Sequence, residues 1–331
     1  MRSSSKLFPV ALISADFRGD LTEDVYRLKP GNSPDPTVEL ALTRLGKADQ
    51  QQRGMPVILL AGSFSNRRFW YSPKGIGLGA DLAREGMDVW LVEMRGHGLS
   101  PRNRQYLRNT VNDYVRFDLP AIAEFIYELN PQKAHWLGHS LGGVIIAAAL
   151  GGQHLDQGKI ASVMLFGSQV SSGHWALKIP PVEWCARLVL TVRKFLSGPD
   201  LKRGPEDEPA SLAIEAMRWH GLFGRFRSPE RDWWAGLAEV NIPTMAVTAV
   251  ADRMDPAWGC EKMLNQFGSQ AKQLLVLGKA NGFSSDFGHV EMLLSKEAQR
   301  EVWPLIKQWL NHQHPPVMDA TATEELQPCS A

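Results

Sequence analysis

Short apolar runs alternate with helix-like stretches along most of this 331-residue chain, and this alternation most restricts how it can fold. The predicted strands cover residues 56–61, 88–93, 134–137, 162–166, 244–249 and 273–277. The predicted helices cover residues 78–85, 112–129, 141–150 and 296–311. A strand that is apolar on both faces is typical of a parallel sheet with helices packed on each side. The pattern therefore predicts an α/β fold.

Three segments depart from this alternation. Residues 22–45 are predicted to form an antiparallel hairpin with its turn at residues 30–36, where Pro, Gly, Asn and Asp gather. Residues 171–240 contain helical pieces and five of the eleven tryptophans. Residues 313–331 are polar and aperiodic, which favours disorder. We expect an N-terminal extension at 1–21, an α/β core at 22–170 and 241–312, a helical lid at 171–240 and a disordered tail at 313–331.

The composition excludes several classes of partner and site. The chain has 36 Lys and Arg against 35 Asp and Glu, so no charge excess favours nucleic acid or an anionic membrane surface. No segment approaches the ~20 apolar residues needed to span a bilayer. Three scattered cysteines (Cys185, Cys260 and Cys329) make neither a disulfide framework nor a zinc site. They favour a reducing compartment, and we expect a cytoplasmic protein.

One N-terminal run has some features of a signal peptide. Residues 7–15 are mostly apolar and follow two basic residues, Arg2 and Lys6. The run is short and contains Pro9, and Ile13 stands where a cleavage site needs a small residue. The sequence therefore favours retention of this segment.

The clearest chemical signal is the sequence Gly138-His139-Ser140-Leu141-Gly142. It directly follows a predicted strand and directly precedes a predicted helix, as a nucleophile elbow requires. Such a turn exposes the serine hydroxyl at the end of the sheet and aims the Leu141 N–H from the helix N-terminus at a developing oxyanion. We therefore predict Ser140 as a nucleophile. The alternative is an ordinary glycine-rich turn between a strand and a helix.

A serine nucleophile needs a base and an acid, which on this type of fold follow in the order serine, acid, histidine. Asp252 and His289 both lie just past predicted strands, where open α/β sheets build their sites. Asp255 is the rival acid, with the alternative that it caps the helix beginning at Pro256. We expect His97 to bond within a turn, and the side chain of His139 to point away from the hydroxyl.

The loop after the first parallel strand is expected to supply a second oxyanion donor. It reads Ala61-Gly62-Ser63-Phe64, and we predict the N–H of Ser63, with that of Phe64 as the alternative. The alternative to any such role is a plain loop at a strand exit. The two nearby tail histidines, His312 and His314, are a weak metal signal. No cofactor and no metal is expected.

Taken together, these motifs resemble the α/β-hydrolase superfamily over residues 22–312. The matching pieces are PVILLAGS at 56–63, DVWLVEMRGHGLS at 88–100, LGHSLGG at 137–143, IPTMAVTAVADRMDP at 242–256 and GHVEML at 288–293. The resemblance implies an eight-stranded, mostly parallel sheet with a lid inserted after the sixth strand. It also implies Ser140 as nucleophile, Asp252 as acid and His289 as base. Many members have His-Gly where this chain has Ala61-Gly62, and the lid matches no pattern that identifies a substrate.

The predicted function is hydrolysis of carboxylic esters with apolar, medium-chain acyl groups, through an acyl-enzyme on Ser140. We expect an apolar ester or thioester as substrate, with an acyl pocket supplied by the tryptophans of a mobile lid. The same acyl-enzyme would serve an acyltransferase or a thioesterase, and a ligand receptor that has lost turnover is a further alternative. Serine at position 140 argues against dehalogenases and epoxide hydrolases, which use aspartate there.

Overall fold

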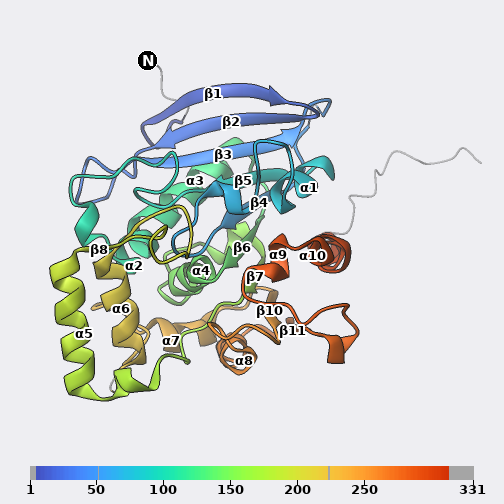
Figure 1. Ribbon diagram of the computed structural model, residues 1–331. Helices are drawn as coiled ribbons and strands as arrows, with labels where there is room; N and C mark the ends of the chain where they lie inside the picture. Colours follow the sequence, from blue (N-terminus) through green and yellow to red (C-terminus); the bar gives the residue numbers. More distant parts are fainter. Residues whose placement is uncertain (1–4, 51, 223, 313–331) are drawn as a thin grey trace, which may run out of the picture.

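A computed structural model describes residues 5–50, 52–222 and 224–312 of the chain. These residues form a nine-stranded sheet in the order β1-β2-β3-β5-β4-β6-β7-β10-β11 (Figure 1). The strands are β1 (Val10–Arg18), β2 (Leu21–Leu28), β3 (Leu40–Lys47), β4 (Pro56–Leu60), β5 (Asp88–Val92), β6 (Ala134–His139), β7 (Ile160–Phe166), β10 (Thr244–Ala249) and β11 (Lys272–Leu277). The strands from β5 to β11 in this order are parallel, whereas β1, β2 and β3 pair antiparallel.

Helices cover both faces of the sheet, as the apolar runs predicted. They are α1 (Leu78–Arg84), α2 (Val111–Asp113), α3 (Leu119–Leu129), α4 (Leu141–Gly151), α8 (Ala257–Gln266), α9 (Glu291–Leu294), α10 (Lys296–Glu301) and α11 (Trp303–His312). Alternate residues of β4 pack on opposite faces of the sheet. Ile58 lies in the core under α3, α4 and α8, and Leu59 lies in the core under α1 and α11. The predicted α/β class is confirmed.

The sheet has nine strands rather than the eight expected, because residues assigned to an N-terminal extension form β1. This strand pairs with β2 from Val10 opposite Leu28 to Arg18 opposite Leu21. It lies at the edge of the sheet, and its apolar side chains Leu12, Ile13 and Phe17 are exposed. An exposed edge strand lacks the alternation of buried and polar residues that identifies a strand in sequence. The segment with signal-peptide features therefore lies partly within β1.

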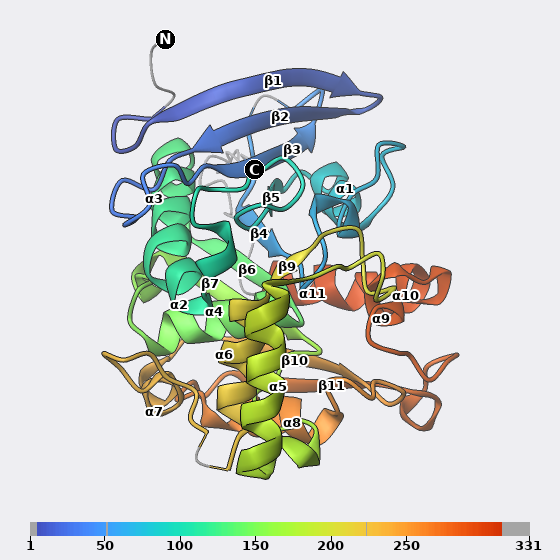
Figure 2. The ribbon, with the colours of Figure 1, turned by 60° about the vertical axis from the view of Figure 1, so that its left-hand side comes forward.

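The segment inserted after β7 carries its own small elements. These are α5 (Pro180–Arg193), β8 (Phe195–Leu196), β9 (Glu208–Pro209), α6 (Ala210–His220) and α7 (Trp233–Gly236). Helices α5 and α6 lie side by side outside the sheet, and α7 packs against α4 (Figure 2). We call residues 171–240 the lid.

The five lid tryptophans occupy different environments. Trp233 is fully buried and forms an aromatic cluster with Trp219 and Phe226, with ring centroids 5.1–6.5 Å apart. In contrast, Trp175 is 69% exposed and Trp184 is 64% exposed. The lid is thus anchored on the α7 side and open to solvent on the α5 side.

None of the described helices is both long and apolar enough to cross a membrane. Cys185 and Cys260 are free thiols. The predicted tail at 313–331 lies outside the described residues.

Candidate active site

Ser140 occupies a strained turn between β6 and α4. It is the N-cap residue of α4, with φ 52° and ψ −124°. A positive φ at a residue other than glycine costs about 1–3 kcal/mol and persists only where the surroundings hold it. Here the Ser140 N–H donates to the Phe166 carbonyl at 2.8 Å, and the Ser168 hydroxyl donates to the Ser140 carbonyl at 3.0 Å. Strand β7 and the loop after it therefore fix the turn.

The two glycines of the motif permit the close packing that this turn needs. A Cβ atom on Gly138 would lie 2.5 Å from the backbone of Gly143, and one on Gly142 would lie 2.6 Å from the carbonyl oxygens of Leu60 and Ala61. Both distances are shorter than real Cβ contacts allow. The spacing G-x-S-x-G thus brings the start of α4 against the ends of β4 and β6.

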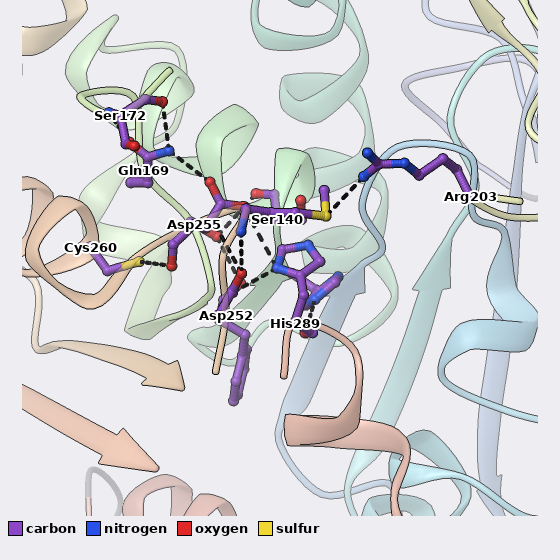
Figure 3. Close-up of polar contacts among 12 residues, drawn as sticks. Ser140, Gln169, Ser172, Arg203, Asp252, Asp255, Cys260 and His289 are labelled. Carbon is purple, nitrogen blue, oxygen red and sulfur yellow. Dashed lines mark hydrogen bonds and ion pairs between the residues drawn. The ribbon is translucent and has the colours of Figure 1, made fainter. Parts of the chain in front are cut away.

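His289 and Asp252 meet beside this turn, as the sequence predicted. The Nδ1 of His289 lies 2.8 Å from an Asp252 carboxylate oxygen, Oδ2. The other oxygen, Oδ1, accepts the N–H groups of Met254 and Asp255 at 2.9 Å each. The Asp252 side chain is fully buried, while 13% of the His289 side chain is exposed. Asp252 is therefore held rigidly, and the imidazole ring remains accessible (Figure 3).

Asp255 does not cap a helix, so that alternative is wrong. The N-cap residue of α8 is Pro256, and no side chain caps this end. Instead, the Oδ2 of Asp255 lies 3.8 Å from the Nδ1 of His289, and its Oδ1 accepts a hydrogen bond from Gln169 at 2.8 Å. The site thus holds two carboxylates beside one imidazole. No motif in the sequence indicated the Gln169 contact.

Burial raises the pKa of Asp255 to about 6, although His289, Gln169 and a hydrogen bond with Ser140 each lower it. In the described residues, the Ser140 hydroxyl has no hydrogen bond to the ring of His289. A long or misaligned contact between nucleophile and base is common without substrate. The structure therefore brings the acid and base together and leaves the hydroxyl beside the second carboxylate.

The two neighbouring histidines, His139 and His289, have pKa values shifted in opposite directions. Burial alone would lower the pKa of His289, but the Asp252 hydrogen bond and the charges of both aspartates outweigh it and raise that pKa above 6.5. Burial and the charge of His289 lower the pKa of His139 to about 3. The Nε2 of His139 lies 2.9 Å from the backbone carbonyl of His289. His139 is thus neutral and donates this hydrogen bond, which holds the His289 loop.

The predicted oxyanion loop packs directly against Ser140. A Cβ on Gly62 would lie 2.8 Å from the Cβ of Ser140, so only glycine fits there. Within the described part of the chain, the N–H groups of Ser63 and Leu141 have no hydrogen-bond partner. The N–H of Phe64 donates to a Glu208 carboxylate oxygen, Oε1, at 2.9 Å. Of the two alternatives, Ser63 therefore has the available amide.

Over the described ranges, no group of three or more His, Cys, Asp or Glu side chains is arranged to hold a metal ion. The site consists of a hydroxyl, an imidazole, two carboxylates and two backbone amides. This set of groups can perform nucleophilic and general acid–base chemistry.

Parts of the chain are similar in sequence to known proteins. The family described as serine aminopeptidase, S33, matches residues 66–213, which include Ser140. Triacylglycerol lipase 2 of Arabidopsis thaliana is 34% identical over 118 residues, covering 33% of this chain and 28% of the lipase. The matched segments span about a third of the length of the first curated relatives.

Two solved structures align with nearly the whole fold. A thermophilic esterase from Thermogutta terrifontis is 19% identical with a TM-score of 0.54, covering 88% of this chain and 99% of the esterase. A monoglyceride lipase variant from Saccharomyces cerevisiae is 16% identical with a TM-score of 0.60, covering 83% and 92%. The protein has the α/β-hydrolase fold. Its partial sequence matches are to lipases and to a serine aminopeptidase family, so the chain is similar to members of the α/β-hydrolase superfamily.

The two histidines are expected to titrate far apart. As the pH falls, His289 takes up its proton first, at a pH above 6.5, because both aspartates stabilise the imidazolium. His139 stays neutral until about pH 3. Long-range ¹H–¹⁵N NMR spectra of the imidazoles measure both values. Protonation of His139 before His289 would contradict this electrostatic description.

Proposed function

We propose that this protein hydrolyses carboxylic esters through an acyl-enzyme on Ser140. The observation that carries the proposal is the buried Asp252–His289 pair at 2.8 Å, beside a serine held in a strained turn. The lipase and esterase names of the similar proteins support an ester as the substrate.

The proposed reaction begins at the Nε2 of His289. Because Asp252 accepts from Nδ1–H, the neutral ring presents the Nε2 lone pair, which takes the proton of the Ser140 hydroxyl. The serine oxygen attacks the ester carbonyl, and the amides of Ser63 and Leu141 hold the oxyanion. His289 then gives its proton to the departing alcohol. A water molecule deprotonated by His289 releases the acid and restores Ser140.

We also propose that the acyl group is apolar and of medium length. An open cavity of about 510 Å³ lies mostly among lid residues and includes Val170, the neighbour of the Gln169 that contacts Asp255. Its apolar walls include Trp219, Phe226 and Trp234. Large aromatic surfaces of this kind bind alkyl chains by excluding water. Lys178, Arg225, Asp232 and Lys262 also line it, so the cavity offers charged groups to a polar end of the substrate.

Replacing the nucleophile is expected to abolish turnover without unfolding the protein. Ser140→Ala should lose roughly a millionfold in kcat, because nucleophile and base act as a unit. The measurement is hydrolysis of p-nitrophenyl esters, with circular dichroism to verify folding. A fluorophosphonate probe should label the wild type at Ser140 and leave the variant unlabelled. Near-normal hydrolysis by folded Ser140→Ala would refute the mechanism.

The two aspartates should differ in the kind of effect they have. Asp252→Asn presents the wrong hydrogen-bonding group to Nδ1 and should lower kcat by on the order of 10⁴. Asp255→Asn keeps an oxygen for Gln169 but removes a charge that raises the pKa of His289. Its kcat/KM should therefore begin to rise at lower pH than that of the wild type. The assignment is reversed if Asp255→Asn is the inactive variant.

The length of the acyl chain should control specificity. Each methylene buried in the cavity contributes up to ~0.8 kcal/mol, or about fourfold in kcat/KM, until the cavity is full. A series of esters from C2 to C8 should show this rise and then a plateau. Thioesters and an added alcohol acceptor, tested in parallel, distinguish thioesterase and acyltransferase activity. A flat series would reject the apolar acyl pocket and leave the role of Ser140 intact.

A further inference from the structure

Two hydrogen bonds join the lid to the predicted oxyanion loop, and both are made by the backbone of Phe64. The N–H of Phe64 donates to Oε1 of Glu208 at 2.9 Å, and its carbonyl accepts the N–H of Glu206 at 3.0 Å. Figure 2 shows the segment between β8 and β9 extending from the lid to the carboxyl ends of the central strands. Residues 144 positions apart in sequence are therefore joined directly beside Ser140.

Phe64 needs such contacts because its backbone is strained. Its φ is 60°, a left-handed value that costs a residue with a Cβ roughly 1–2 kcal/mol. A conformation of this kind persists where its hydrogen-bonding groups are held from outside. Both of the backbone bonds that hold Phe64 come from the lid.

Glu208 is built into this contact. Only 4% of the residue is exposed, and its second oxygen, Oε2, lies 3.5 Å from the Nε2 of His97. The Nδ1 of His97 lies 3.1 Å from the carbonyl oxygen of Ser65, and the carboxylate of Glu206 accepts from the Asn66 side chain. Burial disfavours a charge on His97, but the Glu208 carboxylate outweighs it and raises the pKa of His97. The loop from Phe64 to Asn66 is thus held at successive residues.

A buried carboxylate is an unfavourable choice if stability alone is required. Removing a charge from water costs several kcal/mol per ion, and apolar replacements of buried ion pairs are often as stable or more stable. Among the residues that the structure describes, the N–H of Phe64 is the one backbone group that the Glu208 side chain binds. The contact therefore fixes the orientation of the peptide between Ser63 and Phe64.

We infer that Glu208 is a positioning residue, which sets the orientation of the Ser63 amide by holding the next peptide in the chain. This inference rests on the proposed ester hydrolysis and assigns part of its oxyanion hole to the lid. With the Glu208 bond in place, the loop holds the N–H of Ser63 in position to donate to the oxyanion. Without it, the peptide between Ser63 and Phe64 rotates, and the loop no longer holds a donor at the oxyanion.

An inhibitory role for Glu208 would predict the opposite effect of its removal on kcat. If the N–H of Phe64 were the true oxyanion donor, Glu208 would occupy it and inhibit the enzyme. Removal of Glu208 would then increase kcat. The direction in which kcat changes when Glu208 is replaced therefore distinguishes the two roles.

The test compares Glu208→Gln and Glu208→Ala with the wild type, using Asp207→Asn as the matched control. Asp207 is the neighbour of Glu208, and its carboxylate pairs with Arg102, away from the loop. Loss of one oxyanion donor costs about 10²–10³ in kcat, so Glu208→Ala should lose about 100-fold. Charge-assisted hydrogen bonds are roughly twice as strong as neutral ones, so Glu208→Gln should lose about 3- to 10-fold.

In both variants KM should stay within about threefold of the wild type, because an oxyanion donor acts mainly in the transition state. Asp207→Asn should leave kcat unchanged. The Glu208→Gln comparison stands by itself if Glu208→Ala does not fold. A kcat of Glu208→Gln equal to or above that of the wild type overturns the inference. Absence of wild-type turnover and of Ser140 labelling would instead refute the proposed function itself.

Discussion

The close approach of α4 to the ends of β4 and β6 is the constraint on which the rest of the site depends. It requires glycine at positions 138 and 142, because a Cβ at either position would collide with backbone. The same approach leaves Ser140 with a positive φ and the Leu141 amide without a partner in the described chain. Backbone packing alone thus places a half-buried serine and an available N–H group at one point.

Burial then gives each titratable group near this point a different character. His139 and His289 have ring centroids 4.5 Å apart, yet it is His289 that contacts the carboxylates of Asp252 and Asp255. His139 is accordingly kept neutral and serves as a hydrogen-bond donor, while His289 keeps a raised pKa. Asp252 is held by two backbone amides, whereas burial raises the pKa of Asp255 to about 6. Identical side chains therefore take different roles according to their contacts.

The sequence predicted the features that follow from local chemistry. Buried parallel strands are apolar throughout, and an elbow needs small residues at fixed spacing, so the sheet and the position of Ser140 could be read directly. Edge strand β1 was missed because exposure removes the pattern that marks a strand. The contacts of Gln169 and Glu208 were also missed, since each joins segments that only the folded chain brings together. Asp255 was open to two interpretations because a carboxylate before Pro256 fits a helix cap equally well.

The contacts between the lid and the core limit how far the sequences of the two can vary independently. A lid that only covered a pocket could vary freely, because its side chains would touch the substrate alone. Here Glu206 and Glu208 bond the backbone of Phe64, and a Cβ on Gly204 would lie 2.2 Å from the Phe64 carbonyl oxygen. At Gly204 this segment therefore packs directly against the backbone of the core. Helix α5, which has no buried residue, is free of that constraint. The sequence of α5 can therefore vary more freely, while Gly204, Glu206 and Glu208 must keep the geometry of the loop.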